Sequence, residues 1–304
     1  MRLFVTGASG WIGSAVVGEL LAHNHQVLGL ARSDASADQI AAAGAEVRRG
    51  EVTNLNILRA AAAECDGVVH LAFRHDVAFA GDFGTAVASD HAAIEAIGDA
   101  LAGTDKPLAI ASGLAGLRAG EIATEDDRPQ PTPGAGGRVI NERTALSLAE
   151  RGVRSMSVRF APTVHGAGDH GFIARIVAAD HEHGAAAYVG DGENRWPAVH
   201  VTDAARLVRL GIERAPAGSV LHAAGEEGVA FRHIAEAIGR RLQLPSTSIP
   251  AEQAGEHFGF LGAFVGLDAP ASSTRTRELL GWQPTGPGLI ADIAAGAYDP
   301  LPVT

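Results

Sequence analysis

Short apolar runs alternate with longer helical patterns through the first half of the chain. The apolar runs, which predict strands, are residues 3–5, 26–30, 46–48, 67–71, 108–111 and 155–159. Alanine-rich stretches with helical spacing lie between them, at residues 12–23, 55–63 and 86–101. Because strands that alternate with helices form βαβ units, the pattern predicts an α/β protein with a doubly wound parallel sheet.

The regular alternation ends at residues 124–137, where acids, then prolines, then glycines predict a long surface loop. A helix is predicted next, at residues 139–150. Another helix is predicted to begin at Asp203, with its carboxylate as the N-cap. Residues 220–223 predict one more strand of the parallel sheet.

The second half of the chain is less regular and holds several large aromatic side chains. Six of them could line an apolar pocket or fill a core, namely Phe172, Trp196, Phe258, Phe260, Phe264 and Trp282. We expect a larger domain of residues 1–160, completed by about residues 199–224. A smaller, substrate-binding domain is expected from the remaining segments of residues 161–304.

Composition narrows the class of protein further. Among 304 residues, 24 are Lys or Arg and 35 are Asp or Glu, and a net charge of −11 disfavours a nucleic-acid partner. Cys65 is the only cysteine, which excludes an intrachain disulfide and a cysteine-rich metal site. His165, Asp169 and His170 lack a convincing ligand spacing, so no metal is predicted. No apolar stretch is long enough for a signal peptide or a membrane span, so we expect a cytoplasmic protein without a membrane partner.

A glycine-rich motif, Thr-Gly-Ala-Ser-Gly-Trp-Ile-Gly, occupies residues 6–13 between the first predicted strand and helix. Gly7 permits a tight turn, Gly10 lets the backbone approach a pyrophosphate, and Gly13 lets the helix pack closely on the strand. The helix N-terminus adds free N–H groups and a positive dipole end. This context predicts a Rossmann-type dinucleotide site rather than a glycine-rich turn with no ligand. The expected contacts are Gly7, Ser9, Gly10, Trp11, Ile12 and Gly13.

The end of the second predicted strand indicates which dinucleotide is bound. Sites for NAD usually place an acid there for the ribose hydroxyls. Here the strand is followed by Arg32 and Ser33, which can pair with a 2′-phosphate and donate a hydrogen bond to it. Asp34 is a competing acid, and an exposed arginine without a ligand is the alternative. The pattern favours NADP(H) over NAD(H).

The motif at residues 6–13 resembles the TGxxGxxG fingerprint of the extended short-chain dehydrogenases/reductases, also called the NAD-dependent epimerase/dehydratase family. Further segments resemble that family in the same order, at residues 70–72, 112, 158–159, 164–166, 199–203 and 281–284. The resemblance implies cofactor contacts at Leu71 and Ala72. It also implies that Ser112 hydrogen-bonds the reacting oxygen.

The catalytic YxxxK pair of that family is missing. The only tyrosines are Tyr188 and Tyr298, and the only lysine is Lys106. If Glu142 matches the acid that follows the pair, Gly134 stands at the tyrosine and Arg138 at the lysine. The chain thus resembles an atypical subgroup of unknown substrates in which HxxxR replaces the pair, although Gly134 stands where the histidine would be.

Arg138 can still perform half of the lysine's work. Its guanidinium can bind the nicotinamide ribose and supply fixed positive charge, but it cannot release a proton at neutral pH. The alternative is an ion pair with Glu142 on an exposed helix. Both interpretations remain open at this point.

Proton donors would then come from histidines that follow strands, because strand carboxyl ends converge on the ligand in such folds. The predicted catalytic residues are Ser112, Arg138, His75 and His165, while His170 and His200 are further candidates. Together they predict an NADP(H)-dependent oxidoreductase acting on a small carbonyl or alcohol substrate, with epimerase or dehydratase chemistry as a variant. The alternative is a non-catalytic NADP(H)-binding sensor or scaffold. A homodimer is compatible with the sequence.

Overall fold

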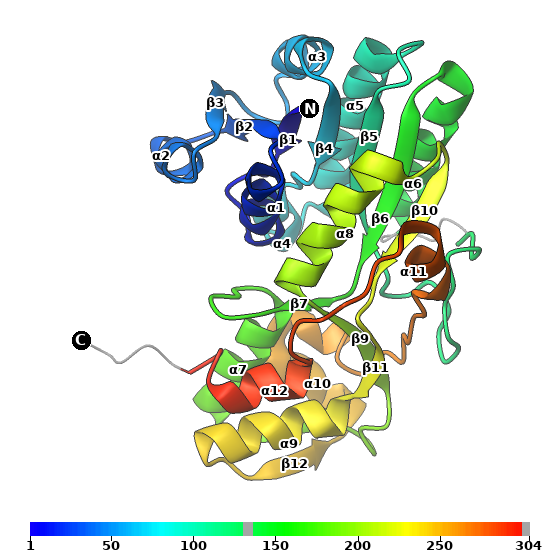
Figure 1. Ribbon diagram of the computed structural model, residues 1–304. Coiled ribbons are helices and arrows are strands. Elements are labelled where there is room, and N and C mark those ends of the chain that lie inside the picture. Colours follow the sequence, from blue (N-terminus) through cyan, green and yellow to red (C-terminus); the bar gives the residue numbers. More distant parts are fainter. Residues whose placement is uncertain (130–135, 300–304) are drawn as a thin grey trace.

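A parallel seven-stranded sheet forms the centre of the computed structural model, which describes residues 1–129 and 136–299 (Figure 1). The strand order is β10-β6-β5-β4-β1-β2-β3. The strands are β1 (Arg2–Thr6), β2 (Gln26–Ala31), β3 (Glu46–Arg49), β4 (Gly67–His70), β5 (Pro107–Gly113), β6 (Arg154–Phe160) and β10 (Ser219–Ala223). Strands β2 and β3 are added on one side of β1, whereas β4, β5 and β6 are added on the other side. This order confirms the predicted doubly wound Rossmann-type fold.

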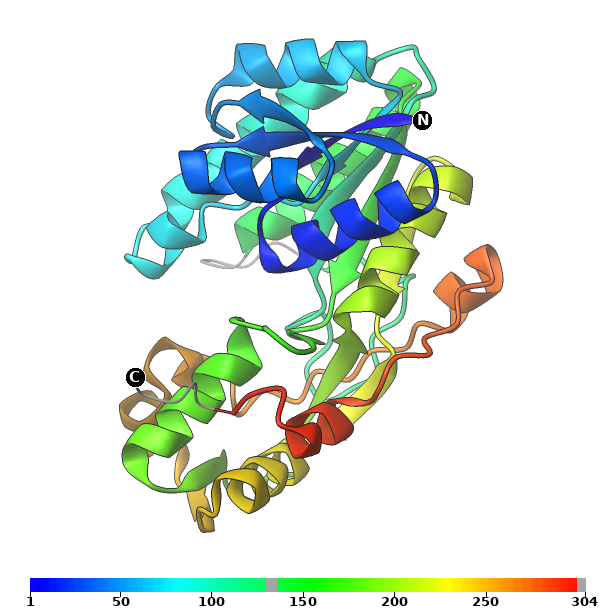
Figure 2. The same cartoon turned by 60° about the vertical axis from the view of Figure 1, so that its left-hand side comes forward.

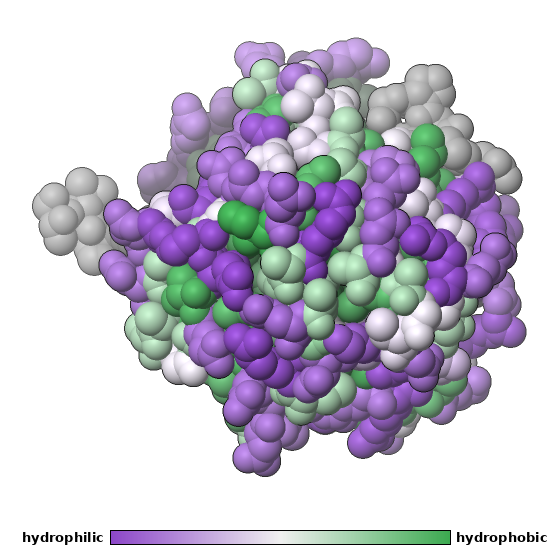
Figure 3. Space-filling model, turned by 90° about the horizontal axis from the view of Figure 1, so that it is seen from above, coloured by the Kyte–Doolittle hydropathy of each residue, from purple (hydrophilic) through white to green (hydrophobic). Residues whose placement is uncertain are grey.

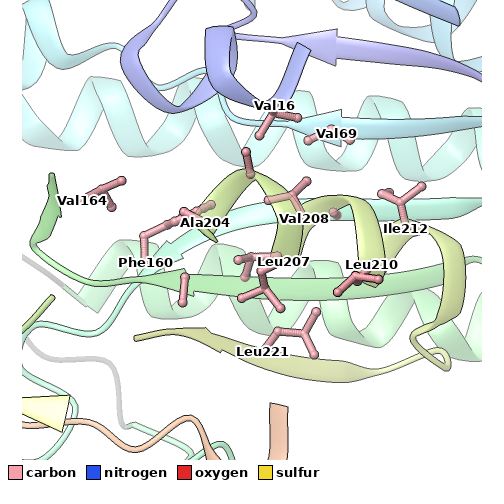
Figure 4. Close-up of a cluster of buried hydrophobic side chains, with 14 of the residues drawn as sticks. Val16, Val69, Phe160, Val164, Ala204, Leu207, Val208, Leu210, Ile212 and Leu221 are labelled. Carbon is pink, nitrogen blue, oxygen red and sulfur yellow. The ribbon is translucent and has the colours of Figure 1, made fainter. Parts of the chain in front are cut away.

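Helices cover both faces of this sheet. One face carries α1 (Trp11–Ala22), α2 (Asp34–Ala42) and α8 (Val201–Arg214). The other carries α3 (Leu55–Glu64), α5 (Phe83–Leu101) and α6 (Gly136–Ser147), continued by η1 (Leu148–Arg151). Val16 of α1 and Val208 of α8 pack with Leu221 of β10 in one apolar cluster (Figure 4). A sheet buried on both faces explains why its strands read as nearly continuous apolar runs.

A second hydrophobic core lies at the end of the molecule away from α3 (Figures 1 and 2). Its sheets are β11-β9-β7 and β12-β8. The strands are β7 (Thr163–His165), β8 (Ala186–Val189), β9 (Arg195–His200), β11 (Glu226–Ala230) and β12 (Ser246–Ile249). The helices are α7 (Phe172–His183), α9 (Phe231–Leu242), η2 (Ala251–Gln253), α10 (Ala254–Phe258), η3 (Gly259–Ala263) and α12 (Leu289–Ala295). The proposed domain boundary at residue 160 stays a prediction.

Two short helices lie outside these groups. Helix α4 (His75–Phe79) follows β4, and α11 (Thr274–Leu280) packs near β10 at the sheet edge. Trp282, just after α11, is fully buried and donates from its indole to the carbonyl of Asp203 at 3.0 Å. The C-terminal segment therefore returns to the large sheet before it enters α12.

The predicted start of α8 was wrong by a few residues. The helix begins at Val201, and its N-cap is His200, whose Nδ1 accepts from the backbone N–H of Thr202 at 3.4 Å. Asp203 lies in the first turn, where its carboxylate accepts from the backbone N–H groups of Thr285 and Gly286. An acid is favourable both at the N-cap and within the first helical turn. The sequence alone therefore does not show which of these two positions Asp203 occupies.

Seen from the end that carries α3 and α5, the surface is mostly hydrophilic, with apolar side chains scattered in small groups (Figure 3). Such scattered apolar residues are normal on protein surfaces. Within residues 1–129 and 136–299, no helix has the length and apolar character needed to cross a membrane.

Candidate active site

The loop between β1 and α1 shows why each glycine of the motif is present. Gly7 has a φ of +68°, and a Cβ there would lie 2.8 Å from the backbone nitrogen of Ala72. At Gly13 an added Cβ would lie 1.9 Å from the carbonyl oxygen of Gly7, so helix and strand could not pack. Gly10 has an ordinary φ of −75°, and its Cβ would meet only the Gly7 oxygen, at 3.2 Å. The fold itself therefore requires Gly7 and Gly13 far more than Gly10.

The N-terminus of α1 is available to an anion. Gly10 is its N-cap and has no side chain to cap the first turn. The N–H groups of that turn thus lack a side-chain acceptor, while the helix dipole adds positive potential. Ser9, half-buried beside them, has no side-chain hydrogen bond to any described residue. Trp11 points elsewhere, because its indole donates to the carbonyl of Val164 at 2.7 Å.

A buried chain of polar groups ties this loop to β4, α5 and α6. Thr6 Oγ1 lies 2.8 Å from Nδ1 of His70, and Nε2 of His70 lies 3.1 Å from Asp90 Oδ1. Because a carboxylate only accepts, Nε2 donates to Asp90, and Thr6 donates to Nδ1. Asn141 Nδ2 donates to the other Asp90 oxygen at 2.7 Å. The backbone N–H of Ala72 completes the chain by donating to Thr6 Oγ1 at 3.2 Å.

This hydrogen-bonded network keeps the carboxylate of Asp90 charged. Burial raises the pKa of Asp90, but the hydrogen bond from His70, the positive charge of Arg138 and the hydrogen bond from Asn141 outweigh it, so that pKa lies below its ordinary value. A satisfied buried network of this kind fixes the relative positions of the elements that it joins. Here it holds the glycine-rich loop against α6, the helix that carries Arg138.

Two arginines, Arg32 and Arg49, lie at the ends of the neighbouring strands β2 and β3. Arg32 is largely exposed and forms an ion pair with Asp76 at 2.9 Å. Ser33 is the N-cap of α2 and accepts from the backbone N–H of Ser36. Arg49, at the end of β3, pairs with Asp34 and donates to the carbonyl of Ser33. The competing acid Asp34 is therefore already neutralised by an arginine that the sequence pattern did not single out.

Arg138 of α6 reaches the backbone of β5 next to Ser112. Arg138 Nη2 donates to the carbonyl of Ala111, the residue before Ser112, at 2.9 Å. The guanidinium carbon lies 4.3 Å from the ring centroid of Phe73, within the range of a cation–π contact. Burial lowers the pKa of Arg138, whereas Asp90 and Glu142 raise it. The sequence did not indicate Phe73, because its contact with Arg138 joins the loop after β4 to α6, two segments far apart in the chain.

Glu142 does not act as the partner of Arg138 on an exposed helix. Both of its carboxylate oxygens accept from the buried Arg159, at 2.8 and 2.9 Å, and Ser157 donates to one of them at 2.5 Å. Arg159 and Glu142 are both buried. The exposed ion pair considered as the alternative for Arg138 is thus absent from the described residues, and Gly134 lies outside them.

His75 shares an aromatic surface with Arg138. It begins α4, and its ring centroid lies 5.1 Å from that of Phe73 and 5.5 Å from that of Phe79. Desolvation and the positive charge of Arg138 lower the pKa of His75 below its ordinary value. The structure thus places both Arg138 and His75 in contact with Phe73, while Ser112 directly follows Ala111, whose carbonyl accepts from Arg138.

His165 makes its contacts elsewhere. It is buried in β7, with Nδ1 2.6 Å from Oδ2 of Asp292 and its ring 5.6 Å from that of His200. Its Nε2 is buried and has no hydrogen-bond partner among the described residues. Burial lowers the pKa of His165 despite the hydrogen bond with Asp292. His170 lies against Trp11, with ring centroids 6.1 Å apart.

The fold and this loop geometry define a Rossmann-type NAD(P)-binding enzyme. The sequence pattern of the NAD dependent epimerase/dehydratase family matches residues 3–224, and the chain belongs to that family. This confirms the family resemblance drawn from residues 6–13 and, at the level of the family, the expected class of NAD(P)-dependent enzyme.

Two yeast proteins resemble the chain over nearly its whole length. An uncharacterized protein of Schizosaccharomyces pombe is 45% identical over 300 residues, which cover 98% of this chain and 100% of the relative. An uncharacterized protein of Saccharomyces cerevisiae is 42% identical over 297 residues, covering 97% and 98%.

Solved structures share the fold at lower identity. MoeE5 in complex with UDP-glucose and NAD has a TM-score of 0.76 at 23% identity, covering 98% of this chain and 97% of that chain. DesIV, a dTDP-glucose 4,6-dehydratase from Streptomyces venezuelae solved with NAD bound, has a TM-score of 0.77 at 21% identity, covering 98% and 96%.

Proposed function

We propose that this protein is an NADP(H)-dependent oxidoreductase that acts on a small carbonyl or alcohol substrate. The observation that carries the proposal is the position of Arg138, which donates to the carbonyl next to Ser112 and covers Phe73 beside His75. Ser112 lies at the carboxyl end of β5, His75 follows β4, and Arg138 contacts the end of β5 from α6. Ligands of doubly wound sheets bind at this edge of the sheet. They form a site that lacks the family's tyrosine and lysine.

The residues present fit a dinucleotide. The uncapped first turn of α1 and the open space at Gly10 suit a pyrophosphate, with Ser9, Trp11, Ile12 and Gly13 supplying the loop and helix N–H groups around it. Leu71 and Ala72, which pass directly over Gly7, would flank the cofactor. When bound, the reduced nicotinamide supplies the hydride.

Each catalytic residue has a distinct role in carbonyl reduction. Ser112 would donate a hydrogen bond to the substrate oxygen and stabilise the negative charge that develops on it. Arg138 would hold the nicotinamide ribose, and its positive charge would stabilise the developing negative charge. His75 or a water molecule then delivers the proton to that oxygen, and the product is an alcohol.

The preference for NADP(H) rests on the charges around Ser33. Arg32 is free enough to exchange Asp76 for a phosphate, since both partners of this pair are more than half exposed, at 65% and 53%. Arg49 pairs with Asp34, the acid that directly follows Ser33 and would repel a 2′-phosphate. Ser33 adds a hydroxyl at the N-terminus of α2.

Arg32→Asp is expected to shift preference from NADPH toward NADH by at least about tenfold, because a cation that pairs with the 2′-phosphate becomes an anion that repels it. Titration calorimetry with both cofactors measures the two Kd values. Arg59→Asp, an exposed change on α3, is the matched control and should leave their ratio unchanged. An unchanged ratio in Arg32→Asp would make Arg32 a bystander and remove the basis of the NADP(H) preference.

The lowered pKa of His75 predicts a pH dependence. Its protonated form becomes more abundant only as pH falls, so if His75 supplies the proton, reduction should slow about tenfold per pH unit above that pKa. His75→Asn should flatten the profile between pH 6 and 9. The same slope in the variant would assign the proton to water or another group.

The missing tyrosine and lysine also support the second candidate, a non-catalytic NADP(H)-binding sensor or scaffold. A sensor binds the cofactor without turnover and has a partner whose affinity depends on NADPH. A panel of carbonyls and alcohols, assayed for NADPH oxidation or NADP reduction, separates the candidates. Tight NADPH binding with no turnover across the panel would favour the sensor.

A further inference from the structure

Arg175 is an exposed arginine in the first turn of α7, and its guanidinium has no hydrogen bond or ion pair with any described residue. Among residues 1–129 and 136–299, every other arginine has at least one such partner, which is a carboxylate, a side-chain oxygen or a backbone carbonyl. The chain has 35 Asp or Glu against 24 Lys or Arg, so a shortage of acids does not explain this difference.

Two aromatic rings hold Arg175 in place. Its guanidinium carbon lies 5.3 Å from the ring centroid of Phe79 and 5.6 Å from that of Phe260, within the range of cation–π contacts. The two rings come from α4 and η3 and lie 4.7 Å apart. Phe79 and Phe260 are 47% and 41% exposed, unusually high for side chains of this size. These contacts position the guanidinium and leave its N–H groups available to a ligand.

Phe79 connects Arg175 to the proposed proton donor. The ring centroid of His75 lies 5.5 Å from that of Phe79, so His75 and the guanidinium share one aromatic ring. On its other side, His75 contacts Phe73, which lies under Arg138. After burial, the positive charges of Arg138 and Arg175 both lower the pKa of His75, which agrees with this proximity. An unpaired cation therefore lies beside the site, at the opposite end of this series of contacts from Arg138.

We propose, on the basis of the function proposed above, that Arg175 binds a carboxylate of the substrate, which is then a keto acid. The planar fork of a guanidinium matches a carboxylate with two parallel hydrogen bonds. Since Arg138 is assigned to the ribose, one guanidinium remains for the substrate, and its charge equals that of one carboxylate. Phe79 and Phe260 would contact the methylene groups between the carboxylate and the carbonyl. One hydride from NADPH and one proton convert the keto acid to a hydroxy acid.

The first test compares pyruvate, acetoacetate and levulinate with their methyl esters as substrates for reduction with NADPH. The three acids place the carboxylate at increasing distance from the ketone, and each ester keeps the shape of its acid but lacks the charge. We expect at least one acid to exceed its ester at least tenfold in kcat/KM, because a charge-assisted contact is lost in the ester. Esters that are as good as their acids throughout, or a preference for dihydroxyacetone phosphate over every acid, would overturn the proposal.

Arg175→Gln should lower kcat/KM for the preferred acid at least tenfold, mainly through KM, and leave that of its ester within twofold. Arg175→Lys should recover part of the loss, because it keeps the charge but not the fork. Arg59→Gln, which removes the same charge from the exposed face of α3, is the control and should behave as the wild type. An equal loss for acid and ester in Arg175→Gln would show that Arg175 only supports the two rings.

Failure of the proposed oxidoreductase function gives a different result. In that case no compound of the series is reduced, yet the acids should still bind the NADPH-loaded protein in calorimetry more tightly than their esters. Their affinity should fall at least tenfold in Arg175→Gln. Absence of binding of every acid to the wild type would contradict the carboxylate site itself.

Discussion

Gly10→Leu is expected to weaken dinucleotide binding more than 100-fold and to leave the protein folded. Gly10 has an ordinary φ of −75°, and a Cβ there would meet only the Gly7 oxygen, at 3.2 Å. The backbone can therefore accept a side chain with little adjustment. The leucine would fill the space in which the pyrophosphate approaches the helix N-terminus.

Calorimetry with NADPH, beside thermal unfolding, measures both halves of this expectation. Gly18→Leu is the matched control on the same helix, because Gly18 is exposed and a Cβ there has no neighbour within 4 Å. That variant should keep its affinity for NADPH and gain stability. Unchanged affinity in Gly10→Leu would place the cofactor somewhere other than the glycine-rich loop.

Arg138→Ala is expected to lower kcat/KM about 10- to 150-fold and to weaken cofactor binding in parallel. The loss corresponds to one charge-assisted contact, worth about 1.5–3 kcal/mol. Arg138→Lys should recover part of both effects, because lysine keeps the charge but replaces a planar fork with a single point. Among residues 1–129 and 136–299, the fork donates one N–H group to the carbonyl of Ala111, and its other N–H groups would donate to the ribose.

Steady-state kinetics, cofactor titration and thermal unfolding of both variants decide the role of Arg138. Arg151→Ala is the control, since Arg151 forms an exposed ion pair with Asp99 and should cost under about 1 kcal/mol of stability with no kinetic effect. Wild-type kinetics and affinity in Arg138→Ala would show that its contacts with Ala111 and Phe73 are structural. Catalysis would then rest on Ser112 and His75.

The large sheet could be predicted because each of its strands is recognisable from the apolar residues within the strand itself. Its strands are short apolar runs, and all seven begin and end within two residues of the predicted runs. The strands of the two smaller sheets, β7, β8, β9, β11 and β12, were not predicted, since each is short and its partner lies in another segment of the chain. The pattern within such a strand does not reveal its partner.

The candidate site also has parts that the sequence predicts and parts that it does not. Gly7 and Gly13 could be interpreted from sequence because the local backbone demands them. The partners of charged side chains could not, because Glu142 pairs with Arg159 rather than with Arg138 one helical turn away. Similarly, His165 was expected to follow the sixth strand, but it lies within the unpredicted strand β7, and its partner Asp292 lies 127 residues further along the chain.

The most direct test of an oxidoreductase without the tyrosine and lysine is whether hydride leaves the cofactor for the substrate. NADPH carrying deuterium on one face of nicotinamide C4 can be incubated with the protein and a panel of aldehydes, ketones and keto acids, and the alcohols examined by mass spectrometry. We expect one deuterium at the former carbonyl carbon from one face only, none from the other, and a marked loss of transfer in Gly10→Leu. Tight NADPH binding with no deuterium in any alcohol would contradict the oxidoreductase function and leave a cofactor-binding sensor.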